Sequence, residues 1–216
     1  MNIRIPLELL KEITNTAQER NIYAHPNPLA RDIFWQRLEK LYKLIQRYAK
    51  RNYQVLDLGG GSGMFTKALS SFFQTADIID MDNNDARKII DYFKIKNANL
   101  FDGDINEIKL ERRYQAIIAA DVLEHFYNLD EPLTFLRAHL EKDGLLFISV
   151  PTENWLYIIG RILIGKKKPD THYHSSKTII NFLVQNGFKI LKKTSSPAYI
   201  INIPLFEIAI LKYSGL

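Results

Sequence analysis

The chain has 216 residues, of which 46% are hydrophobic and 25% are charged, a balance that is typical of a soluble globular domain and excludes global disorder. It contains no cysteine, which excludes disulfides, thiolate catalysis and cysteine-based zinc sites. The formal charge of +5 is mild and is more typical of simple solubility than of nucleic-acid binding, so no nucleic-acid partner is expected.

Residues 1–50 are predicted to form an N-terminal helical cap on a second unit, residues 51–216. Helices are expected over 7–20 and 29–50, where apolar residues recur at helical spacing with charged residues, Arg37 among them, in between. The apolar start is too short for a signal peptide, and no stretch approaches the length needed to cross a bilayer. A cytoplasmic location is therefore the expectation.

From residue 53 onward, short apolar runs alternate with helical stretches, which indicates βαβ units and an α/β fold with a parallel sheet. Strands are predicted over 53–58, 76–81, 98–101, 115–120, 144–150, 188–195 and 205–212, and helices over 63–73, 84–94, 130–141 and 176–186. Asp143-Gly144 and Asn186-Gly187 are interpreted as glycine caps that end the last two helices. Because ligands of open α/β sheets bind beyond the carboxyl ends of the strands, residues just after each strand are the site candidates.

The most informative segment is residues 55–63, in which an apolar run containing Asp57 leads into a glycine-rich turn. The glycines are Gly59, Gly60, Gly61 and Gly63. Such a turn between a strand and a helix lets the backbone approach a ligand closely. Met64 stands where a dinucleotide GxGxxG pattern needs its last glycine, and Asp57 would repel a pyrophosphate. The segment therefore favours S-adenosylmethionine, which carries an ammonium, a sulfonium and a ribose but no phosphate.

Acids follow the next two predicted strands. Asp82 is preferred to Asp80 as the acceptor for a ribose diol, because Asp82 directly follows the predicted end of its strand; Asn83 beside it joins the expected cofactor site. After the third strand, Asp104 could accept from an adenine amino group while Ile105 packs on the ring. In isolation each acid is an ordinary turn residue.

The segment after the fourth predicted strand carries the candidate chemistry. The small Ala120 leaves room for a ligand, and Asp121 joins the expected cofactor site. Glu124 and His125 are expected where a reacting acceptor would lie, and His125 is the first candidate for a general base. The alternative, a histidine with a purely structural role, stays open.

Two further base candidates, His172 and His174, lie just before a predicted helix with Ser175 or Ser176 as its N-cap. No metal site is predicted, because no third and fourth ligands accompany this His-x-His pair. The insert at 152–176 contains a nearly all-apolar run followed by three lysines at 166–168. It could be a lid over the acceptor, a dimer interface, or a membrane-surface contact through 155–168, and the chain could be a monomer or a homodimer.

Taken in order, these motifs resemble those of the class I S-adenosylmethionine-dependent methyltransferases, in particular the small-molecule branch of ubiquinone and menaquinone biosynthesis. The resemblance covers about residues 50–190 and implies a Rossmann-like seven-stranded sheet, order 3-2-1-4-5-7-6, with the last strand antiparallel. It implies that the glycines hold the methionine part, Asp82 the ribose, and Asp104 with Ile105 the adenine. Residues 27–31 are similar to an Asn-Pro-Leu-Arg stretch whose arginine faces the cofactor, which implies that role for Arg31. Two departures are the inserted Ala30 and Gln115, where the family has an aspartate.

The leading hypothesis is therefore a methyltransferase that uses S-adenosyl-L-methionine to methylate a small, apolar or amphipathic acceptor. An RNA or protein methyltransferase is the alternative, although residues 120–123 are not an Asn-Pro-Pro-Tyr-type amide-binding motif. A non-catalytic protein that binds S-adenosylmethionine is a third hypothesis, and the intact glycines and acids count against it.

Overall fold

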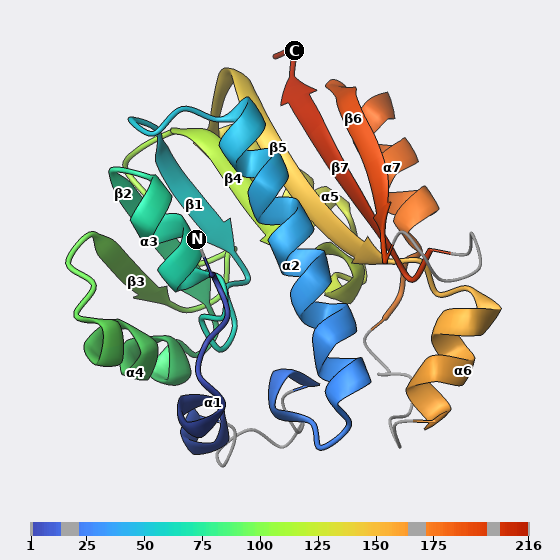
Figure 1. The fold of residues 1–216 in the computed structure, drawn as a ribbon. Helices are drawn as coiled ribbons and strands as arrows, with labels where there is room; N and C mark the ends of the chain where they lie inside the picture. Colours follow the sequence, from blue (N-terminus) through green and yellow to red (C-terminus); the bar gives the residue numbers. More distant parts are fainter. Residues whose placement is uncertain (1, 14–21, 164–171, 198–203, 216) are drawn as a thin grey trace.

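The computed structural model describes residues 2–13, 22–163, 172–197 and 204–215. These residues form one seven-stranded sheet with the strand order β3-β2-β1-β4-β5-β7-β6 (Figure 1). Neighbouring strands are parallel except β7, which is antiparallel to both β5 and β6. The predicted fold class, strand order and antiparallel last strand are confirmed.

Most strands lie within two residues of their predicted bounds. They are β1 (Gln54–Leu58), β2 (Thr75–Asp80), β3 (Ala98–Asp102), β4 (Tyr114–Ala120), β5 (Leu140–Pro151), β6 (Phe188–Ser196) and β7 (Phe206–Tyr213). The helices are α1 (Leu7–Ile13), α2 (Pro28–Tyr48), α3 (Thr66–Phe72), α4 (Asn84–Phe93), α5 (Asp130–His139), α6 (Trp155–Leu163) and α7 (Ser176–Gln185), with short 3₁₀ turns η1 (Ile22–Ala24) and η2 (Leu123–His125). The prediction for residues 14–20 falls outside the described residues.

Apolar clusters cover both faces of the sheet. On one face, α1, α2, α3 and α4 pack against alternate residues of the strands, such as Val55, Ile78 and Ile118. On the other face, α5 and α7 pack against the intervening residues, such as Leu56 and Ile117. In Figure 1, α2 crosses in front of the sheet while α5 and α7 lie behind it. Each central strand is therefore buried on both sides, which explains its nearly continuous apolar sequence.

The interpretation of Asp143-Gly144 as a helix cap is wrong. Helix α5 ends at His139, and Leu140 already pairs with β4. The pairing then shifts from Tyr114↔Leu140 to Ala116↔Leu145, so residues 141–144 form a bulge within β5 in which Asp143 has φ +64°. A left-handed Asp followed by glycine suits such a bulge as well as it suits a helix end. The Asn186-Gly187 cap is confirmed, since α7 ends at Gln185 and Gly187 has φ +93°.

The helix starts also follow local capping chemistry. The Asn27 side chain accepts from the backbone N–H groups of Leu29 and Ala30 at the start of α2, and Ser175 accepts from Thr178 N–H at the start of α7. Ser175, one of the two predicted caps, is thus the N-cap. Helix α3 begins at Thr66, three residues later than predicted, because the turn after β1 extends to Phe65.

Candidate active site

The turn after β1 is held against the end of β2. The N–H groups of Gly59 and Gly60 both donate to the carbonyl oxygen of Ile79, at 2.9 and 3.1 Å. Gly63 N–H donates to Gly60 O at 2.9 Å and closes the turn. The two strands thereby present one rigid edge at their carboxyl ends.

Two of the glycines are required for different reasons. Gly63 has φ +73°, and a Cβ there would lie 2.7 Å from the Cα atom of Ala86 in α4, so close helix packing excludes a side chain. Gly61 has φ +53°, but a Cβ there would meet only Asp80 Oδ2, at 4.0 Å. The space above Gly61 is therefore open to a ligand, which approaches the bare backbone.

Asp57 lies beneath this turn and is almost completely buried. Burial, together with the nearby negative charge of Asp80, raises the pKa of the Asp57 carboxyl to about 8. A carboxyl in this environment carries a proton at neutral pH. The predicted repulsion of a pyrophosphate by Asp57 requires an ionised carboxyl, so the raised pKa of Asp57 counts against it.

The predicted end of the second strand is wrong by one residue: β2 ends at Asp80, and Asp82 does not directly follow its tip. Asp80 Oδ2 accepts from Gly61 N–H at 2.7 Å, which places this carboxylate against the open part of the glycine turn. Asp82 is exposed, and its Oδ1 accepts from Asn84 N–H at the start of α4. The strand-end position that was expected for Asp82 thus belongs to Asp80.

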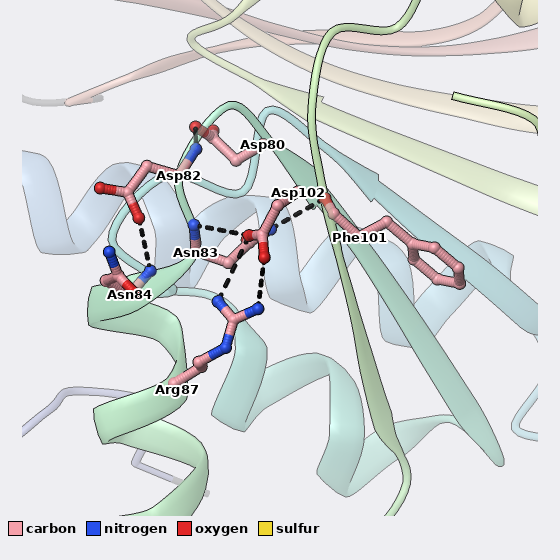
Figure 2. Close-up of polar contacts among 7 residues, drawn as sticks. All are labelled: Asp80, Asp82, Asn83, Asn84, Arg87, Phe101 and Asp102. Carbon is pink, nitrogen blue, oxygen red and sulfur yellow. Dashed lines mark hydrogen bonds and ion pairs between the residues drawn. The ribbon is translucent and has the colours of Figure 1, made fainter. Parts of the chain in front are cut away.

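Figure 2 shows how the ends of β2 and β3 are joined. Asp102, the register partner of Asp80, accepts from both the backbone N–H and the side-chain amide of Asn83, at 3.1 and 2.9 Å. The Asn83 amide also donates to Phe101 O, and Arg87 forms an ion pair with Asp102. These bonds, Arg87 first, lower the pKa of Asp102 to about 2. The buried Asn83 side chain therefore links the ends of β2 and β3 by hydrogen bonds. Asp102 was not among the site residues predicted from the sequence.

The other residues predicted for the adenine lie on the following loop. Asp104 Oδ1 accepts from the backbone N–H and the side-chain amide of Asn106, at 2.8 and 2.9 Å, within its own turn. Ile105 is partly buried against the second apolar cluster. Both follow the carboxyl end of β3, as expected, and their contact with adenine stays a prediction.

The carboxyl end of β4 carries an ion pair between a half-buried aspartate and a buried arginine. Asp121 follows Ala120 with φ +57°, its N–H donates to Ser149 O at 2.8 Å, and its carboxylate pairs with Arg37. Arg37 projects from α2 with only 3% of its surface exposed, and donates to Tyr23 OH at 2.6 Å. The helical pattern placed Arg37 among the charged residues between the apolar positions of α2, and in the fold this residue is buried and paired with Asp121.

The Arg37 guanidinium also lies over aromatic rings. Its carbon is 5.6 Å from the centre of the Phe34 ring and 4.9 Å from that of Phe206. Cation–π contacts of this kind stabilise an arginine that is removed from water. The rings of Phe34 and Phe206 thus provide an apolar surface beside the acidic residues at the end of β4.

Next along the chain, η2 brings Glu124 to the same region. Glu124 is fully buried, and in the described ranges neither of its carboxylate oxygens accepts a hydrogen bond from another residue. Burial raises the pKa of Glu124 to about 7, although the positive charge of Arg37 acts in the opposite direction. Side-chain atoms of Glu124, His125 and His172 lie within 4.8 Å of one another, close enough to hold a common cation.

The structure thus brings together two of the three predicted base candidates. The rings of His125 and His172 lie 4.7 Å apart, edge to face. The remaining candidate, His174, has its Nε2 atom 3.1 Å from the carbonyl oxygen of Tyr127. Sequence reasoning missed the partner of His172: its Nδ1 atom lies 2.8 Å from Oε1 of Glu153, just beyond β5.

Arg31, also predicted for the cofactor, lies in the first turn of α2. Its guanidinium donates to the carbonyl oxygens of His25 and Pro26 in the turn before the helix. It lines a cavity of about 380 Å³ between residues 4–10 and the start of α2. Its contact with the cofactor stays a prediction.

Helix α6 lies beside the sheet, away from α5 and α7 (Figure 1). The Tyr157 ring packs on Phe206, with ring centres 5.5 Å apart, whereas Trp155 and Ile162 are 58% and 65% exposed. Within the part of the chain that the structure describes, no helix is long and apolar enough to cross a membrane. The predicted basic end of this segment, residues 166–168, lies outside the described residues.

The sequence is similar to those of known methyltransferases. Residues 31–193 match a family model described as a methyltransferase domain. A malonyl-[acyl-carrier protein] O-methyltransferase of Bacillus cereus is 31% identical over 109 residues, which are 49% of this chain and 40% of that protein. A ubiquinone biosynthesis O-methyltransferase of Rickettsia canadensis is 23% identical over 175 residues, 76% of this chain and 72% of that protein. The chain spans about 40% of the length of the two malonyl-[acyl-carrier protein] O-methyltransferases that it matches.

Solved structures share the fold. The N-methyltransferase NodS from Bradyrhizobium japonicum WM9, in complex with S-adenosyl-L-homocysteine, superposes with a TM-score of 0.69 at 15% identity and covers 95% of this chain and 96% of its own. The magnesium protoporphyrin IX methyltransferase ChlM from Synechocystis PCC 6803, with the same product bound, gives a TM-score of 0.68 at 18% identity, covering 96% and 94%.

Proposed function

Because the chain belongs to the methyltransferase domain family, whose model it matches over residues 31–193, we propose that it transfers a methyl group from S-adenosylmethionine to a small, apolar or amphipathic acceptor. One observation carries the proposal: an open glycine turn, a strand-end carboxylate and a cluster of proton-accepting side chains share one edge of the sheet. That edge is where open α/β sheets bind their ligands.

The residues of the edge fit the cofactor. Gly61 offers bare backbone for the methionine part, and its open space is the space a side chain would fill, whereas Gly59 and Gly63 are packed against Val122 and Ala86. Asp80 is the proposed acceptor for the ribose hydroxyls, in place of Asp82, because Asp80 stands at the strand end beside Gly61. Met81, 69% exposed next to it, offers an apolar surface for the adenine ring.

When bound, S-adenosylmethionine supplies an electrophilic methyl carbon on a positively charged sulfur. The protein's part is to hold the acceptor in line with that carbon and to remove a proton; positioning of this kind can contribute roughly 7–11 kcal/mol. We assign the proton transfer to His125 or His172, whose rings lie together, rather than to His174, whose Nε2 atom lies 3.1 Å from Tyr127 O. The half-buried rings of Phe34 and Tyr157 pack on the buried Phe206 ring nearby, and this apolar surface favours an apolar acceptor.

Titration calorimetry with S-adenosylmethionine, its demethylated product and NAD tests the cofactor assignment. We expect micromolar binding of the first two and none of NAD, because Met64 stands where the dinucleotide pattern needs its last glycine. Absence of binding by both sulfur compounds would overturn the proposal. Transfer of labelled methyl groups to small phenols and amines, but not to bulk RNA or protein, is the expected acceptor result; labelling of RNA or protein favours the alternative.

We also propose that helix α6 contacts a membrane surface. Helix α6 exposes Trp155, Ile158, Ile159 and Ile162, and the sequence continues into the lysines at 166–168. An exposed apolar helix face followed by positive charge suits an anionic lipid surface. An apolar acceptor could reach the site from such a surface.

A further inference from the structure

We propose that Glu153 is a positioning residue for methyl transfer: by holding Nδ1 of His172 it leaves Nε2 of that ring to take the proton of the acceptor. This assignment rests on the proposed function and extends it to two residues that the motifs of the chain did not connect. Glu153 lies two residues after the end of β5, and His172 lies four residues before the start of α7.

The contact between the two side chains is short and shielded from water. His172 Nδ1 and Glu153 Oε1 are 2.8 Å apart, and the side chains are 8% and 12% exposed. A carboxylate accepts hydrogen bonds only, so Nδ1 of a neutral His172 ring must carry the proton of this bond. Nε2 of that tautomer holds a lone pair and is the basic nitrogen.

Both residues are held in place by hydrogen bonds of their neighbours. Glu153 has φ +53°, a conformation that is costly for a residue other than glycine. It is fixed from both sides, since Thr152 N–H donates to Leu205 O at 3.0 Å and the Asn154 amide donates to Pro204 O at 2.6 Å. Tyr173 N–H, next to His172, donates to Glu124 O at 2.9 Å. The dyad is therefore preorganised by backbone contacts from β7's leading segment and from η2.

The charges around His172 suit a base that becomes positively charged. Glu153 and Glu124 face it from the insert and from η2, His125 packs on its ring, and Arg37 pairs with Asp121 further along the same edge. A carboxylate on Nδ1 stabilises the imidazolium that forms when Nε2 gains a proton. His125, by contrast, has an exposed position. The geometry thus favours His172 over His125 as the base.

The step balances without a further reactant. The acceptor's O–H or N–H bond breaks, and its proton goes to Nε2 of His172. The electron pair left on the acceptor atom forms the new bond to the methyl carbon, and the pair of the broken carbon–sulfur bond stays on sulfur. Glu153 exchanges no proton and remains a carboxylate throughout.

The tautomer can be measured directly, without cofactor. In long-range ¹H–¹⁵N spectra of protein labelled with ¹⁵N-histidine, we expect neutral His172 to carry its proton on Nδ1; a spectrum of His172→Gln identifies its signals among the five histidines. Glu153→Leu should shift the proton to Nε2, whereas Glu153→Gln keeps an acceptor oxygen and should keep it on Nδ1. Glu207→Gln, which removes a carboxylate paired with Lys193 instead, is the control and should change nothing.

Kinetics separate positioning from mere support of the fold. General bases contribute roughly 10²–10⁴-fold, so His172→Gln should lower kcat by about 10² or more and Glu153→Leu by about 10 or more, with the KM for S-adenosylmethionine within a few-fold. The double variant should be no slower than His172→Gln alone, because Glu153 acts through His172. If Glu153→Leu does not fold, Glu153→Gln replaces it, with a lowered kcat and an unchanged tautomer expected.

Three results would overturn the assignment: an Nδ1 proton that persists in Glu153→Leu, rate losses that multiply in the double variant, or activity that a chelator abolishes and a divalent ion restores. The last result would make the cluster a cation site. Absence of S-adenosylmethionine binding with the Nδ1 tautomer present would instead overturn the proposed function and leave the dyad standing.

Discussion

At the scale of single residues, the buried Asp57 carboxyl links protonation to folding. Its pKa of about 8 in the folded chain lies above the ordinary 3.8, so between these values the folded state holds a proton that the unfolded state has released. The stabilisation is complete below pH 4 and is lost as the pH rises to about 8, at a slope of about 1.4 kcal/mol per pH unit. Stability to urea should therefore fall from pH 5 to pH 8.

Asp57→Asn should make that dependence shallower, because an amide keeps the shape of the protonated acid and cannot ionise; the part due to Glu124, whose pKa burial also raises, should remain. Urea unfolding of the variant and of the wild type at several pH values checks this. Asp82→Asn, a change at an exposed carboxylate, is the control and should keep the wild-type slope. A wild-type slope in Asp57→Asn would show that Asp57 is already ionised in the folded protein.

The two acids after β2 give a second residue-level prediction. Asp80→Asn should weaken S-adenosylmethionine binding roughly 10- to 150-fold, since hydrogen bonds to a charged acceptor are worth about 1.5–3 kcal/mol. Asp82→Asn should change binding by less than about 3-fold, because the amide oxygen can still accept from Asn84 N–H as Asp82 Oδ1 does now. Titration calorimetry of both variants with S-adenosylmethionine measures the two affinities. A larger loss of affinity in Asp82→Asn than in Asp80→Asn would return the ribose role to Asp82.

At the scale of elements, α6 presents two different faces, and its aromatic residues should behave differently. Tyr157 packs on Phe206 beside Arg37, so Tyr157→Ala should impair transfer to an apolar acceptor and leave S-adenosylmethionine binding within a few-fold. Tyr157→Phe keeps the ring and should retain most of the activity. Loss of cofactor binding in Tyr157→Ala, with the fold intact, would place α6 over the cofactor instead.

Trp155 lies on the exposed face of α6, 58% exposed, and offers the membrane test. Trp155→Ala should reduce sedimentation with anionic liposomes several-fold and leave turnover of a water-soluble acceptor unchanged, because interfacial tryptophan contributes to lipid binding. Neutral liposomes are the comparison. Analytical ultracentrifugation of both proteins tests the rival reading: a dimer that Trp155→Ala dissociates would make this face an interface.

The sequence pattern predicts helices and strands well, but not the contacts between them. Periodicity located α2 and its apolar face, but treated Arg37 as one of the charged residues between apolar positions. Its burial depends on Tyr23, Asp121 and Phe206, which only the folded chain brings to it. The prediction of the end of β2 failed for a similar reason. Met81 is apolar and continues the apolar run of the sequence, although the pairing of β2 with β3 stops at Asp80.

At the scale of the whole molecule, the sheet order followed from the resemblance of the motifs, and the alternation of apolar runs indicated its parallel part. The position of the site at the carboxyl edge followed from topology alone. The Glu153–His172 contact did not, since the two residues are 19 apart and joined by a segment without a motif. Sequence patterns report on neighbours along an element; contacts between two loops depend on the packing of the entire edge.

Binding of the cofactor should be visible in the stability of the entire chain. The proposed site joins the ends of β1, β2 and β4, which belong to the cooperative core on both faces of the sheet, so a ligand bound there stabilises the folded state as a whole. At a concentration about 100 times its dissociation constant, S-adenosylmethionine should add roughly 2.7 kcal/mol to the free energy of unfolding. For a chain of 216 residues this is a rise in Tm of about 5–10 °C.

Differential scanning calorimetry with S-adenosylmethionine, its demethylated product and NAD measures this rise in Tm. The first two should raise Tm and NAD should not, while Asp80→Asn should need a higher concentration for the same shift; a rise with NAD alone would replace the methyltransferase assignment by that of a dinucleotide-binding protein.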